Sequence, residues 1–363
     1  MEVRICRVNS ERVGHFISDI SEHLARSNIK GKNVDFFYFG DIANEQWATM
    51  AKRTSLRILG PWLKYVEQWN YIIPGGQMHK IGSSLTESRD IENLFGRFDV
   101  RIPFLASEND EGTSWLRSKG WTEGEPYICL LVRDSTYLNN VFPDGDFRYH
   151  DYRDSDINTY VPAMEWLASQ GVWVLRMGKL MEKPIQTNSS RIIDYAFAPD
   201  KSDLLDIWLF ANCAGVISTG TGLDQIAMVY QIPQLYLNAL PLECIHSWSD
   251  MIWVPKNLKF KKTGSPLTLK EYVESNFYTS LEYTVAEIEI VDLSSSEITA
   301  AVMEFWSKIV GTWAYTENDL SLQKTFWDIL ARSSKFESMH GSRHRNAAIG
   351  KDWLTSAIKD SDI

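Results

Sequence analysis

The segment 215–224, read Gly-Val-Ile-Ser-Thr-Gly-Thr-Gly-Leu-Asp, is the part of the sequence best suited to binding an anion. A short apolar strand is followed by small residues and then by a helix predicted over 222–230. Backbone N–H groups at the start of a helix have no partner within it, and glycine lets a phosphate approach the backbone. A tight turn without a ligand is the alternative. The pattern predicts a phosphate site formed by Ser218, Thr219, Gly220, Thr221, Gly222 and Asp224.

Basic residues stand at the ends of two predicted strands. Arg133 follows a strand over 127–132, Arg176 ends one over 172–176, and Lys179 comes shortly after it. Because neighbouring parallel strands end at the same edge of a sheet, we expect these side chains to gather near the loop. Guanidinium groups donate paired hydrogen bonds to phosphate, so they suit a leaving diphosphate. The alternative is a set of surface ion pairs with Asp134, Asp151 and Asp154.

Two more assignments rest on single residues. Lys201 precedes a helix predicted over 202–212, and we expect it to reach a phosphate, with Ser202 beside it as the N-cap. His15 follows the first strand, next to Gly14, where an imidazole can take a proton from a hydroxyl group. An incidental loop histidine is the alternative.

The run Tyr152-Arg153-Asp154-Ser155-Asp156 collects charge just before a helix predicted over 156–169. Capping explains one of its acids but not the whole run. Its Asp-x-Asp spacing also occurs at 144–146 and 360–362, as chance allows for so short a motif, so no metal site is predicted.

Composition narrows the class of protein. The 363 residues include 47 acidic and 37 basic side chains, a net charge of −10 that disfavours binding to long nucleic acids. Gln225 stands where a dinucleotide fingerprint needs its third glycine, and no Walker lysine follows the loop, which disfavours an oxidoreductase or an NTPase. No apolar run approaches 20 residues, and the first seven residues carry charge, so a cytoplasmic location is expected.

One basic run, Lys256–Lys262, stands out in this acidic chain. A solvated loop is one interpretation. The other is contact with an anionic surface, such as the inner face of the cytoplasmic membrane or a lipid-linked substrate.

Strands and helices alternate along the chain, which is typical of α/β proteins with parallel sheets. Two doubly wound units are predicted, separated by a polar linker over 107–126. Their predicted domain ranges are 1–115, 125–335 and, for a helical tail, 336–363. The strands are expected over 3–8, 34–39, 56–59, 71–73, 127–132, 172–176, 192–197, 215–218, 234–237 and 285–291.

The motifs Tyr-Arg-Asp-Ser-Asp-Ile at 152–157, Arg-Met-Gly at 176–178 and Ser-Thr-Gly-Thr-Gly-Leu at 218–223 resemble those of one bacterial family of glycosyltransferases. The family is found with surface-polysaccharide genes of the cell envelope. The resemblance covers about residues 125–355. It implies a GT-B fold, in which two Rossmann-like domains face each other across a cleft and the tail crosses back to the first domain.

The resemblance implies transfer of a sugar from a nucleotide-activated donor to a surface-glycan or lipid-linked acceptor, without a metal or other cofactor. Under it, His15, Arg133 and Arg176 are the expected catalytic residues. Arg12, Gly14, Tyr152, Arg153 and Asp154 are assigned to the acceptor. Lys179, Lys201, Ser202, Asp224 and the loop 218–222 are assigned to the donor. The alternatives are another nucleotide-sugar enzyme, such as an epimerase or hydrolase, and a non-catalytic scaffold of a polysaccharide assembly complex.

Overall fold

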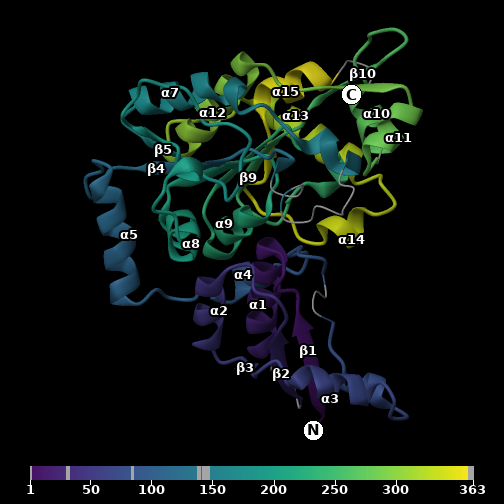
Figure 1. The fold of residues 1–363 in the computed structure, drawn as a ribbon. Coiled ribbons are helices and arrows are strands. Elements are labelled where there is room, and N and C mark those ends of the chain that lie inside the picture. Colours follow the sequence, from purple (N-terminus) through teal and green to yellow (C-terminus); the bar gives the residue numbers. More distant parts are fainter. Residues whose placement is uncertain are drawn as a thin grey trace. The chain divides into compact units, whose positions relative to one another are not determined.

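The computed structural model describes residues 2–29, 33–82, 86–136, 140, 148–275 and 277–358 (Figure 1). Their contacts divide the chain into two compact units. The N-terminal unit comprises Met1–Trp115, Ser202–Asn212 and Gly222–Gln231, and the large unit comprises Leu116–Lys201, Cys213–Thr221 and Ile232–Ile363. The predicted domain ranges stay a prediction. None of the described helices combines the length and the apolar character that a bilayer crossing needs.

The N-terminal unit contains a three-stranded parallel sheet in the order β1-β2-β3. Val8 pairs with Phe39 at one end of the register, so β1 and β2 run side by side over their whole lengths. The strands are β1 (Val3–Val8), β2 (Val34–Phe39) and β3 (Arg57–Ile58). The helices of this unit are α1 (Val13–Ser27), α2 (Glu45–Lys52), α3 (Leu63–Asn70), α4 (Leu94–Arg97), α8 (Asp203–Asn212) and α9 (Gln225–Tyr230).

Two sequence predictions for this region are wrong. No strand forms over 71–73; these residues are exposed turns after α3, because the Asn70 side chain closes the chain back on the Gly76 carbonyl at 2.6 Å. The expected linker over 107–126 begins as a helix, α5 (Ala106–Ser118). Its Gly112 lies against the Trp208 ring so closely that a Cβ would come within 2.2 Å, so this glycine serves packing rather than flexibility.

Asp19 on α1 is an ionisable side chain buried within the N-terminal unit. The side chain is fully buried and accepts a hydrogen bond from the Asn9 backbone N–H at 3.1 Å. Burial raises its pKa to about 8, with smaller contributions from the charges of Glu22 and Glu11. The carboxyl group is therefore protonated in the folded chain at neutral pH.

We expect the stability of the chain to fall as pH rises from about 4 to 8 because of Asp19. The unfolded carboxyl releases its proton near its ordinary pKa of 3.8, whereas the folded one holds it to about pH 8. The cost is at most about 1.4 kcal/mol per pH unit in this window. Asp19→Asn should flatten that part of the profile, measured by urea unfolding at several pH values. An exposed carboxylate on α5 offers the control: a profile flattened equally by Asp110→Asn contradicts the assignment.

The large unit contains a seven-stranded sheet whose neighbouring strands all run parallel, in the order β12-β9-β8-β7-β4-β5-β6 (Figure 1). The chain runs outward from β4 through β5 to β6, then returns to place β7 on the other side of β4. This order confirms the predicted α/β class with a doubly wound sheet. The strands are β4 (Tyr127–Leu131), β5 (Trp173–Arg176), β6 (Ile192–Ile193), β7 (Gly215–Ser218), β8 (Gln234–Leu237), β9 (Met251–Val254) and β12 (Ala348–Ile349).

Helices and one small antiparallel sheet complete this unit. Four of the described helices of this unit begin with a capping box, among them α10, for which the sequence predicts it from Thr268 and Glu271. The helices are α7 (Val161–Ser169), α10 (Leu269–Glu274), α11 (Ser280–Val285), α12 (Ser295–Ile309), α13 (Glu317–Leu330), α14 (Phe336–His340) and α15 (Lys351–Ala357). The small sheet pairs β10 (Asn257–Phe260) with β11 (Ile288–Val291).

The tail packs within the large unit over its described residues. β12 extends the parallel sheet beside β9, and α15 contacts α12 and α13. The crossing of the tail to the N-terminal domain stays a prediction. The basic run Lys256–Lys262 is not a continuous solvated loop, because Lys256 is buried and the next four residues form β10.

Candidate functional site

The topology of the large sheet locates a candidate site independently of any motif. In an open parallel sheet, ligands bind beyond the carboxyl ends of the strands where the chain reverses its winding direction. Here that switch point lies between β4 and β7. Arg133 and Thr219 follow these two strands and meet there: the Arg133 N–H donates to Thr219 Oγ1 at 2.9 Å, and the Thr219 N–H donates to the Leu131 carbonyl at 3.2 Å.

The run 152–155 crosses this switch point. Arg153 donates from Nη2 to the Gly220 carbonyl at 2.6 Å, and Arg133 donates from Nε to Asp154 Oδ1 at 3.0 Å. The Ser155 N–H donates to the Arg133 carbonyl at 3.1 Å. The structure thus brings Arg153 and Asp154, which we assigned to the acceptor, into one cluster with Arg133 and the loop residues that we assigned to the donor.

Charges of both signs act within this cluster, because Asp151 and Asp134 lie near enough to Asp154 to raise its pKa alongside the two arginines. Burial lowers the pKa of Arg133, and the nearby charge of Arg153 lowers it further. Burial also raises the pKa of Asp154, against the opposing effect of Arg133. Within the described ranges, Arg153 has a carbonyl partner but no ion pair. Asp154 pairs with Arg133, whereas the described partner of Arg153 is a neutral carbonyl, and this arrangement suits an added anion at Arg153.

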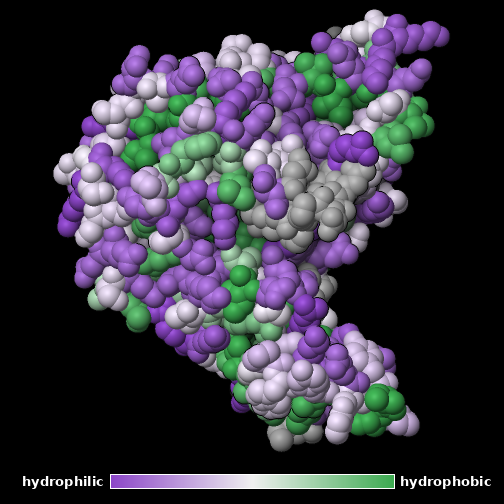
Figure 2. Space-filling model, viewed as in Figure 1, coloured by the Kyte–Doolittle hydropathy of each residue, from purple (hydrophilic) through white to green (hydrophobic). Residues whose placement is uncertain are grey.

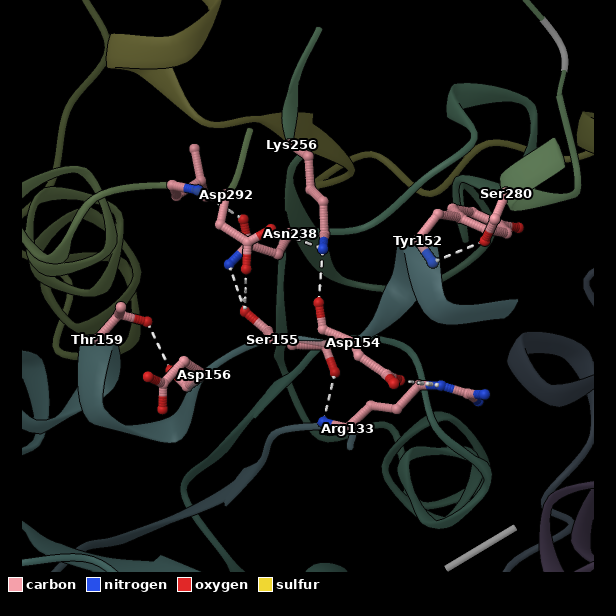
Figure 3. Close-up of polar contacts among 12 residues, drawn as sticks. Arg133, Tyr152, Asp154, Ser155, Asp156, Thr159, Asn238, Lys256, Ser280 and Asp292 are labelled. Atoms are coloured by element: carbon pink, nitrogen blue, oxygen red, sulfur yellow. Dashed lines mark hydrogen bonds and ion pairs between the residues drawn. The ribbon is translucent and has the colours of Figure 1, made fainter. Parts of the chain in front are cut away.

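Three polar residues to which the sequence analysis gave no role at this site hold the 152–155 run in place (Figure 3). Lys256, just beyond β9, donates to the Asp154 carbonyl at 2.6 Å and pairs with Asp292 at 2.7 Å. Asn238, just beyond β8, donates from Nδ2 to Ser155 Oγ at 2.9 Å. Ser155 in turn donates to Asp292 Oδ2 at 3.0 Å. These contacts tie the run to the ends of two further strands.

Among the residues that hold the run in place, Asn238 is the one whose position in the sequence, directly after a strand, could have pointed to it. It directly follows β8, is fully buried, and has a backbone φ of 53° in the left-handed region, which asparagine tolerates better than most residues. Its amide group also donates to the Tyr160 hydroxyl at 2.9 Å and accepts from the Leu293 N–H at 2.8 Å. The role of Asn238 is therefore to position the run rather than to contact a ligand.

The loop 218–222 is only partly open. Ser218 and Thr219 are buried, whereas Gly220 and Thr221 are half-buried. Gly220 needs its φ of +81° to form the turn, and its N–H donates to Ser218 Oγ at 3.0 Å. The residues available to a ligand are therefore fewer than the five that we predicted.

The end of the loop and the following helix differ from the prediction. Gly222 packs against Gly14, and a Cβ on Gly14 would lie 2.7 Å from the Gly222 Cα, so both glycines permit close backbone contact. A 3₁₀ turn with a buried Asp224 precedes α9, which spans only six residues. So short a helix gives no support to the expected role of N–H groups at a helix start in binding the phosphate.

Arg176 lies outside the cluster. Its side chain is fully buried, donates from Nη1 to Asp194 Oδ1 at 3.0 Å, and stands over the Phe197 ring. The ion-pair alternative therefore holds for Arg176 only in part: the pair is internal rather than on the surface, and its partner is Asp194 rather than one of the three acids that we named. A catalytic role for Arg176 stays a prediction without support from these contacts.

The other predicted donor residues have structural partners. Lys201 donates from Nζ to the carbonyls of Lys179 and Ala196, and Lys179 itself is exposed. Ser202 caps α8, as predicted, by accepting the Leu205 N–H at 3.1 Å. These contacts explain Lys201 and Ser202 without a phosphate. Tyr152 is buried, and its ring packs against Tyr283 with centroids 5.4 Å apart.

His15 lies in the first turn of α1, after the exposed Arg12. Its Nδ1 is 2.9 Å from Ser88 Oγ. Burial lowers the pKa of His15, and the charge of Arg12 lowers it further, so the imidazole is neutral at physiological pH. Neutral imidazole is the form that a general base requires.

Comparisons with known proteins were made for sequence and for structure. No protein-family model and no curated protein matches the chain. Solved structures similar to it include a family 9 glycosyl transferase from Veillonella parvula (10% identity, 69% of this chain and 85% of that one, TM-score 0.44). Another is the E. coli ADP-heptose lps heptosyltransferase II (10%, 66% and 86%, 0.41). A third is the UDP-GlcNAc 2-epimerase of Methanocaldococcus jannaschii (10%, 70% and 89%, 0.36). At these values the likeness carries no argument about activity.

Proposed function

We propose that the protein is a glycosyltransferase that uses a nucleotide-activated sugar. The observation that carries the proposal is the pair of guanidinium groups at the switch point of a doubly wound sheet: Arg133, which pairs with Asp154, and Arg153, which donates to the Gly220 carbonyl. Departure of a nucleoside diphosphate develops negative charge, and preorganised cations at that position lower the barrier. Such stabilisation needs no metal, so metal independence is part of the proposal.

The residues of the cluster would divide the work. Arg153 would contact the diphosphate directly, because its described partner is a neutral carbonyl. Arg133 would add charge from behind, oriented by Asp154 and by the backbone contact with Thr219. The tie from Lys256 to the Asp154 backbone would keep both guanidinium groups fixed as charge develops. Rigid placement of this kind avoids reorganisation during the reaction.

An acceptor hydroxyl must lose a proton during transfer, and His15 is the proposed base because it is neutral and half-buried. The proposed acceptor is a bacterial surface glycan, free or lipid-linked, as the family resemblance implies. A cytoplasmic location belongs to the same proposal.

The experiment that tests the proposal is a calorimetric titration with UDP, GDP, ADP, dTDP and CDP, followed by product analysis with the matching sugar nucleotide. Binding of one diphosphate, and donor that stays largely intact until an acceptor is added, are expected of a transferase. Conversion of the donor sugar without acceptor would identify an epimerase, and release of free sugar would identify a hydrolase. Binding of none of the five would favour a non-catalytic scaffold.

A further inference from the structure

Helix α3 in the N-terminal unit presents its apolar side to solvent. Its buried positions are Leu63, which packs against Ile5 and Tyr38, and Glu67. The carboxylate of Glu67 accepts a hydrogen bond from the Tyr38 hydroxyl on the protein side. The exposed apolar positions follow helical spacing and form one stripe, consisting of Trp62, Tyr65, Val66 and Trp69.

The segment after α3 extends this stripe. Ile72 is 80% exposed, Trp69 is 74% exposed, and Tyr71, Ile73 and Met78 are exposed as well. We call the set Trp62, Tyr65, Val66, Trp69, Tyr71, Ile72, Ile73 and Met78 the α3 patch. Figure 2 shows green hydrophobic atoms at the lower right of the view, where Figure 1 places α3 and the segment that follows it. Exposed apolar side chains gathered on one helix and the segment after it are typical of a docking site.

The charged residues near the α3 patch in the sequence favour one class of partner. Between residues 56 and 81 the sequence has three permanently basic side chains, Arg57, Lys64 and Lys80, and a single acidic one, Glu67. The three basic residues are exposed, whereas the acid is buried and lies 3.9 Å from Lys80. The local charge is positive in a chain whose net charge is −10. A partner that combines an apolar interior with an anionic surface is therefore favoured.

The residue types of the α3 patch favour a lipid bilayer over a glycan as its partner. Tryptophan and tyrosine favour the interface between lipid headgroups and acyl chains, and lysine lies beside them at the headgroup level. Isoleucine and methionine gain nothing against the hydroxyl groups of a glycan, yet they belong to the most exposed part of the patch. We propose that the α3 patch docks the protein on an anionic lipid bilayer.

Flotation with lipid vesicles tests this inference on the full chain, without nucleotide or acceptor. The wild-type chain should bind vesicles of phosphatidylglycerol and phosphatidylethanolamine and bind phosphatidylcholine vesicles less. The double variant Trp69→Ser/Ile72→Ser should lower the partition coefficient by about tenfold or more, since both side chains leave water on docking. Lys64→Gln should lower binding to the anionic vesicles by about fivefold.

The matched control is Leu281→Ser/Val285→Ser on α11, where both side chains are also exposed, by 68% and 75%. This variant should bind vesicles like the wild type, and unchanged unfolding midpoints should show that all variants are folded. Equal binding by the patch variant, or no binding by the wild type, would overturn the inference. So would a dimer, detected by light scattering, that the patch variant abolishes. Because no substrate is present, failure of the transferase proposal leaves this result intact.

Discussion

Replacing Arg153 with alanine should weaken binding of the preferred nucleoside diphosphate by about 10- to 100-fold and lower kcat/KM for transfer by about 100- to 1000-fold. The guanidinium group stands at the switch point, and its described partner is the Gly220 carbonyl rather than a carboxylate. Its loss removes a charged donor from the proposed diphosphate position and leaves no carboxylate unpaired. Titration calorimetry and steady-state kinetics measure the two effects.

The matched control is Arg117→Ala, which removes an exposed arginine of the large unit that pairs with Glu123 on the surface. We expect this variant to keep wild-type affinity and rate. Circular dichroism should show that both variants keep the fold, because neither side chain belongs to the core. Wild-type turnover by the Arg153 variant would remove the charge-stabilisation argument from the proposed function.

Arg176→Ala should destabilise the chain by about 3 to 5 kcal/mol, the range for breaking a buried ion pair. Asp194, whose side chain is 16% exposed, loses its guanidinium partner, and the Phe197 ring loses the group above it. The strand-end argument from the sequence instead predicts loss of transfer with an intact fold. Urea unfolding of the variant separates the two expectations.

Arg191 is a suitable comparison for Arg176, because it also pairs with a carboxylate, Glu125, and stands over an aromatic ring, Trp173. Its pair is partly exposed, so Arg191→Ala should cost about 1 kcal/mol or less. A similar small cost for Arg176→Ala, together with lost activity, would restore the sequence-based role of Arg176.

The sequence determined the elements whose pattern is local. The strands at 3–8 and 34–39, and the parallel strands at 127–131 and 215–218, follow from apolar runs bounded by turn residues. Local capping chemistry predicted the starts of α8 and α10. The strands over 251–254 and 348–349 were missed, and the sheet neighbours reveal them: β9 pairs with β8, and β12, only two residues long, pairs with β9. The helix at 106–118 was missed because its glycine packs against Trp208, 96 positions away.

For the site, the sequence alone indicated Arg133, Thr219 and the run 152–154, because charged and small residues directly after apolar strands are visible in one dimension. Only the tertiary structure decided which of these groups meet. In the folded chain, Arg153 contacts the loop at Gly220, and Arg176 lies in an internal ion pair with Asp194. Asn238 and Lys256 hold the run 152–155 in place. The reason is that an arginine is recognisable from its type, but its burial and its ion-pair partner depend on residues brought together by folding.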